Sequence, residues 1–140
     1  MDKETLRQYR ALKREIAMLE ESIEKLQEQL NEVPVVKGKV QSSMKDFPYV
    51  RTHVTVEQSD PVEAERILKR IRIKKARKKA AEEQLLRIEQ YIQSIPDSTD
   101  RLIFDLVFIQ GKTYRDVGVL LNMEFSNVGK RINRKLSTKN

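Results

Sequence analysis

The segment RLIFDLVFIQGKTYRDVGVLLNMEFSNVGKRINRKL, residues 101–136, decides the fold of the C-terminal part of the chain. Its pattern predicts three short helices, over about residues 100–110, up to about residue 121, and from near residue 126 to about 137. Gly111 suits the left-handed position after a helix, and Ser98 or Thr99 can cap the first helix. Thr113 with Asp116 forms a capping-box-like start for the second helix, which Asn122 ends.

The last two of these helices, joined by a tight turn, are typical of a helix-turn-helix. The small Gly118 lets the first helix of the pair cross close over the second, whose apolar face holds Val128, Ile132 and Leu136. The second helix can then lie in a major groove, with its early residues at base edges and its cations on phosphates. The predicted DNA-contacting residues are Thr113, Tyr114, Arg115, Ser126, Asn127, Lys130, Arg131, Arg134 and Lys135.

This segment resembles region four of bacterial sigma factors. The residues that fall on the pattern of that region without a gap are Arg101, Phe108, Gly111, Thr113, Tyr114, Asp116, Val117, Gly118 and Val128. Two positions depart from it, since Asn122 replaces the usual turn glycine and Val107 stands where a basic residue is common. We expect no promoter-melting sigma region, because the chain leaves no room for one.

A long helical hairpin is predicted ahead of this module. Apolar residues recur every seven positions over about residues 3–31, which is the a/d pattern of a coiled coil. The two lines are Tyr9, Ile16, Ile23 and Leu30, and Leu12, Leu19, Leu26 and Val33. A second long helix is predicted from Asp60 as N-cap to about residue 95, with Pro61 at its first position and Glu63 completing a capping box.

Charge predicts that these two helices pair in an antiparallel hairpin within one chain. Residues 15–32 hold six Glu against one Lys, and residues 66–79 hold nine basic and no acidic residues. A parallel dimer through the first helix is the competing arrangement, and the heptads fit both. The basic run itself has two interpretations: a solvated face paired with the acidic first helix, or an auxiliary contact to phosphates.

The connecting segment, residues 33–59, is long for a plain loop. Residues 50–57 alternate between β-branched and polar side chains, which predicts a short strand, and residues 34–40 could pair with it as a β-hairpin. His53 is the only histidine. With no cysteine and no second histidine nearby, we interpret it as a surface strand residue rather than a metal ligand or catalytic group.

The order of hairpin, connecting segment and helix-turn-helix resembles phage-encoded transcriptional regulators of the RinA/ArpU-like group, over about residues 33–140. We therefore expect an all-α chain, with a coiled-coil hairpin in residues 1–95 and a DNA-binding domain in residues 96–140. The resemblance implies an activator of late phage or prophage genes in a bacterial host cell. Its implied partners are double-stranded DNA and host RNA polymerase, and we expect a homodimer reading two half-sites.

Composition agrees with an anionic partner. The formal net charge is +7 and the sequence pI is about 9.7, which favours nucleic acid. The charged N-terminus predicts no secretory signal, no apolar run is long enough for a membrane helix, and the absence of cysteine fits a reducing cytoplasm. No catalytic set, metal pattern or phosphate loop is present, so we expect no enzyme and no cofactor.

Two other functions fit the same pattern. A small terminase-like DNA-packaging protein also joins a helix-turn-helix to long helices, and it should form a ring of many subunits. A module that binds polymerase or a sigma factor without DNA specificity of its own is the other alternative. The basic last helix argues against this second reading.

Overall fold

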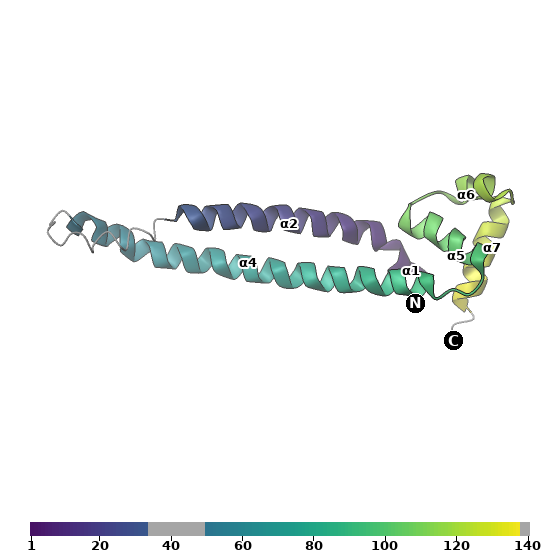
Figure 1. Cartoon of the computed structure of the whole chain (residues 1–140), viewed down its shortest axis with the longest axis horizontal. Helices are drawn as coiled ribbons and strands as arrows, with labels where there is room; N and C mark the ends of the chain where they lie inside the picture. Colours follow the sequence, from purple (N-terminus) through teal and green to yellow (C-terminus); the bar gives the residue numbers. More distant parts are fainter. Residues whose placement is uncertain (34–49, 138–140) are drawn as a thin grey trace. The chain divides into compact units, whose positions relative to one another are not determined.

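The computed structural model describes residues 1–33 and 50–137, and every regular element in these ranges is helical (Figure 1). The all-α prediction is confirmed for this part of the chain. The elements are α1 (Lys3–Arg7), α2 (Tyr9–Glu32), α4 (Val50–Gln93), α5 (Ser98–Phe104), a π-helical turn η3 (Asp105–Ile109), α6 (Tyr114–Leu121) and α7 (Phe125–Ser137).

The chain packs into two compact units. One unit combines Met1–Ile16 with Ala80–Asn140, and the other is Ala17–Lys79. We call them the terminal unit and the central unit. Because both long helices contribute residues to both units, the units do not coincide with segments 1–95 and 96–140, whose assignment as domains stays a prediction.

In the central unit, α2 and α4 run side by side in opposite directions (Figure 1). Their shared core consists of Ile23, Leu26, Val33, Ile67 and Ile71. Three of these residues come from the predicted heptad lines of the first helix, so the heptads correctly located the buried stripe. A charged pair also joins the two helices, with Lys78 Nζ 3.2 Å from a Glu20 carboxylate oxygen.

The start of α4 corrects two predictions. The helix begins at Val50 and contains Pro61, so Asp60 does not begin it. Residues 50–57 are therefore helical rather than a strand, and His53 lies on a helix. β-branched residues have only a weak preference for strands, and continuation of a long helix overrides it. The other arm of the predicted β-hairpin, residues 34–40, lies outside the described residues.

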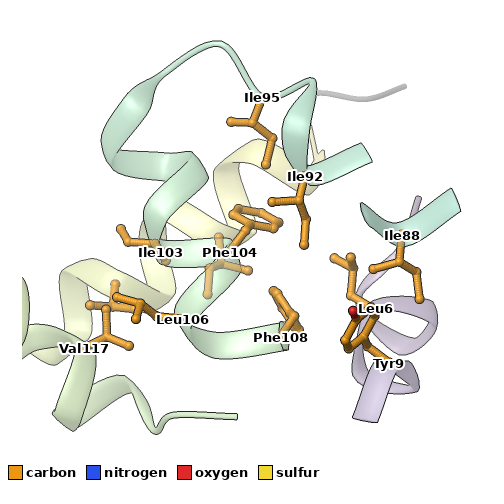
Figure 2. Close-up of a cluster of buried hydrophobic side chains, with 12 residues drawn as sticks. Leu6, Tyr9, Ile88, Ile92, Ile95, Ile103, Phe104, Leu106, Phe108 and Val117 are labelled. Atoms are coloured by element: carbon orange, nitrogen blue, oxygen red, sulfur yellow. The ribbon is translucent and has the colours of Figure 1, made fainter. Parts of the chain in front are cut away.

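The terminal unit is built around a core shared by the two ends of the chain. Leu6 and Tyr9 belong to one buried cluster with Ile88 and Ile92 from the end of α4 and with Ile95, which follows that helix (Figure 2). The same core includes residues of the four C-terminal elements, namely Ile103, Phe104, Leu106, Phe108, Val117, Val128 and Ile132. The N-terminal residues thus stabilise the C-terminal module directly, which the sequence patterns did not predict.

Local geometry in this unit departs from the predicted helices at three points. The predicted first helix is divided at Gln8 into α1 and α2. Asp2 is the N-cap of α1, and its carboxylate accepts a hydrogen bond from the Thr5 amide at 2.8 Å. The predicted apolar helix 100–110 is α5 followed by η3, and its N-cap is Asp97 rather than Ser98 or Thr99. An aspartate at this position carries a charge that the helix dipole favours, which the hydroxyls lack.

Candidate nucleic-acid interface

The turn between α6 and α7 is fixed by backbone geometry at both ends of α6. Thr113 is the N-cap of α6, and its hydroxyl accepts a hydrogen bond from the Asp116 amide at 3.1 Å, as the capping pattern predicts. Asn122 ends it in the left-handed region, with φ 58° and ψ 51°. The Met123 amide then donates to the Gly118 carbonyl at 2.9 Å. The chain therefore reverses sharply, and α7 begins at Phe125.

Gly118 is required by close backbone packing in this turn. A Cβ atom at this position would lie 2.6 Å from the Met123 carbonyl oxygen and 3.3 Å from the Phe125 nitrogen. Neither neighbour is the end of a flexible side chain, so any larger residue would displace the turn. This agrees with the predicted role of Gly118 in letting the two helices approach.

Helix α7 separates a buried face from a polar face. Val128 and Ile132 are fully buried in the terminal core. Four of the predicted DNA-contacting residues are exposed on the same helix: Ser126, Asn127, Lys130 and Arg134. One face of α7 is thus anchored in the terminal core, while these four side chains remain accessible to a partner.

Arg131 has a different environment from its neighbours on α7. Its guanidinium lies 2.7 Å from an Asp100 carboxylate oxygen and 3.3 Å from one of Asp97. The hydrogen bond to Asp100 raises the pKa of Arg131, and the pKa of Asp97 is lowered, first by the hydrogen bond it accepts from the Asp100 amide. Arg131 therefore ties α7 to the first turn of α5.

The other predicted contact residues are placed in three ways. The Thr113 hydroxyl is used as a helix cap, while Tyr114 is half-buried with its ring against Gly129, 3.2 Å from where a Cβ would stand. Arg115 is exposed, and its guanidinium lies over the Phe125 ring at 5.3 Å. Lys135 is half-buried in the last turn of α7. Of the predicted contact residues, Arg115 and the four exposed α7 residues are therefore the ones that are exposed without serving as a helix cap.

The exposure of three apolar side chains on α6 and at the start of α7 was not predicted. Val119, Leu120 and Phe125 are 79%, 58% and 52% exposed. Val119 and Phe125 also line a shallow depression at the turn, together with Arg115 and Met123. Phe125 lies three residues before buried Val128, and this spacing indicates a core residue. Only the position of Phe125 at the start of the helix could have indicated that it is exposed.

Other kinds of site find no support in the described ranges. Among the side chains that the structure describes, in residues 1–33 and 61–137, no group of three or more His, Asp or Glu could hold a metal ion. No helix in the described part of the chain is long and apolar enough to span a membrane. No family model matches the sequence, and neither the curated proteins nor the solved structures include a significantly similar chain.

Proposed function

We propose that α6 and α7 form a helix-turn-helix that binds specific sequences in double-stranded DNA, and that the protein regulates transcription. The observation that carries the proposal is the geometry of α7. Its buried face is anchored by Val128 and Ile132, and its accessible face presents Ser126, Asn127, Lys130 and Arg134. A recognition helix requires this combination of a rigid backbone and polar side chains near its N-terminus.

The chemistry of the accessible residues suits both parts of DNA recognition. Asn127 lies in the first turn of α7, where side chains reach base edges, and an asparagine can bind adenine through two hydrogen bonds. Lys130 and Arg134 follow on later turns and suit phosphate contacts, which position the protein. Arg115 reaches the same region from α6, next to Phe125.

The helical hairpin would supply what a single small DNA-binding module lacks. One module binds weakly, so a homodimer that reads two half-sites is the expected form, with the hairpin acting as a coiled coil or as a surface for host RNA polymerase. The resemblance to RinA/ArpU-like regulators supports activation of late phage genes in a bacterial cell. Pairing of α2 with α4 inside one chain supports the intramolecular hairpin.

The test is selection of random genomic fragments by the full-length protein at two salt concentrations, followed by sequencing. One enriched short site that survives the higher salt supports the proposal, because purely electrostatic binding collapses with salt and shows no sequence preference. The Asn127→Ala variant should lose about 1–3 kcal/mol of discrimination at one base position. Arg14→Ala, which removes an exposed cation from α2, is the control and should keep the selected sequence.

A second candidate is supported by the exposed side chains of Val119 and Phe125, which line the same depression at the turn. Exposed apolar clusters commonly mark protein interfaces, so the same module could bind polymerase or a sigma factor without sequence preference of its own. Uniform fragment selection together with polymerase binding lost in Val119→Asp would favour this function. A ring of many subunits, measured by native mass, would instead favour DNA packaging.

A further inference from the structure

A second basic surface lies on α4 in the central unit, and the proposed DNA-reading module does not account for it. Nine of the fourteen residues from 66 to 79 are Lys or Arg, and none is acidic. In this part of the helix, Ile67 and Ile71 are 2% and 6% exposed and face α2. Seven of the nine cations are exposed, and four of these follow one another along one side of the helix at spacings of three, three and four residues: Lys69, Arg72, Lys75 and Lys79. We call these four residues the α4 stripe.

Pairing with the acidic residues of α2 does not explain the stripe. Lys78 reaches Glu20, and Lys78 is also one of the less exposed cations of the run. Lys25 and Arg66 pair within their own helices, with Glu21 and Glu63. Among the ion pairs formed by the described residues, none involves a member of the α4 stripe.

The arrangement also opposes helix stability. Like charges three or four residues apart on a helix are neighbours and destabilise it by roughly 0.2–0.5 kcal/mol per pair. Lys69 with Arg72, Arg72 with Lys75, and Lys75 with Lys79 are all such pairs. A merely solvated helix face avoids this cost by mixing both signs of charge. An anionic partner along the stripe would relieve the repulsion.

We propose that the α4 stripe is a second DNA-binding site, which holds the sugar-phosphate backbone of a duplex without reading its sequence. The stripe extends over about 15 Å at 1.5 Å per residue, a length along which duplex DNA carries roughly nine negative charges. A protein partner fits less well, because lysine is depleted at protein interfaces and three of the four residues are Lys. This site does not depend on sequence reading by α7.

The test uses the full-length protein and a 30-base-pair duplex of arbitrary sequence, with affinity measured across a series of salt concentrations. In the stripe variant, Lys69, Arg72, Lys75 and Lys79 are all changed to Gln. Each phosphate contact contributes about 0.9 to the slope of log affinity against log salt, so the slope should fall by about 3 to 4. Affinity at moderate salt should fall at least about tenfold, equally for every sequence.

Two matched variants make the result specific. A charge-conserving variant, with Lys→Arg at 69, 75 and 79 and Arg72→Lys, should bind like the unmodified protein. A second fourfold Gln variant removes the same net charge elsewhere, at Arg7, Arg14, Lys25 and Arg87, and should lose clearly less. Far-UV circular dichroism checks that each variant remains helical.

An unchanged slope in the stripe variant overturns the proposal, as does an equal loss in either matched variant. The outcome is separable from that of the proposed function. If α7 variants lose sequence preference while the stripe variant loses affinity uniformly, both proposals stand. If no fragment is ever enriched but the stripe variant still lowers the slope, only the sequence-specific function fails.

Discussion

Replacing Arg131 by Ala should lower stability, although the sequence pattern predicts this residue as a DNA contact. The side chain is 33% exposed and lies 2.7 Å from Asp100, whose side chain is 13% exposed. Fully exposed ion pairs contribute about 0.2–1 kcal/mol, whereas hydrogen bonds to charged groups in partly buried settings contribute about 1.5–3 kcal/mol. The Arg131–Asp100 contact lies between these cases, and we expect Arg131→Ala to cost about 1.5 kcal/mol.

Urea denaturation followed by circular dichroism measures this cost, with Arg134→Ala as the matched control. Arg134 is an exposed arginine on the same helix, so its removal should change the free energy of unfolding by less than about 0.5 kcal/mol. The DNA affinity of the Arg134→Ala variant should nevertheless fall, and its slope of log affinity against log salt should decrease by roughly 1. Opposite results are thus expected for the two substitutions: Arg131→Ala should mainly lower the free energy of unfolding, and Arg134→Ala should mainly lower DNA affinity.

A double-mutant cycle assigns the stability effect to the pair. Arg131→Ala, Asp100→Ala and the double variant should show a coupling free energy of about 1 kcal/mol, which salt reduces. Arg131→Ala with unchanged stability and a coupling near zero would refute the structural role. Arg131 would then belong with Lys130 and Arg134 as a DNA-facing cation.

Three further changes test the packing of the terminal unit. Gly118→Ala should lower stability by about 1–3 kcal/mol, because its Cβ would lie 2.6 Å from a backbone oxygen. Gly129→Ala should lower stability clearly less in thermal unfolding, because its Cβ would meet only an aromatic ring at 3.2 Å. Asn122→Gly should be neutral or slightly stabilising and Asn122→Ala should cost about 1 kcal/mol, because φ is 58° there; equal stabilities would contradict the strain argument. Burial, with the hydrogen bond to Glu89, raises the pKa of Tyr9 to about 12. The protonated Tyr9 hydroxyl therefore makes its full contribution to stability below about pH 10, and this contribution is lost as pH rises through 12. Stability measured across that range should depend less on pH in Tyr9→Phe.

Local chemistry made the α6 turn predictable from the sequence. Thr113, Gly118 and Asn122 each act through backbone groups within a few residues, so a short pattern contains all the required information. The heptad lines similarly located Ile23, Leu26 and Val33 in the central core. These features depend on periodicity and capping, which do not require knowledge of distant contacts.

Features set by distant contacts escaped prediction. Leu6 joins the C-terminal core across more than 80 residues of chain, and nothing in its local pattern marks that partner. Arg131 looked equivalent to Lys130 and Arg134 because all three are cations on one short helix, and only the position of Asp100 distinguishes it. The helical conformation of residues 50–57 likewise depends on the helix that follows them.

The two basic regions of the chain therefore call for different measurements. On α7, individual side chains differ in role, so single substitutions scored by sequence preference and stability separate Asn127 and Arg134 from Arg131. On α4, the members of the stripe are interchangeable cations, so only their combined removal and the salt slope reveal their contribution. A protein that used both surfaces would read sequence with one helix and hold the duplex with another. Loss of the stripe would then lower affinity for every fragment while the ranking of fragments stayed the same.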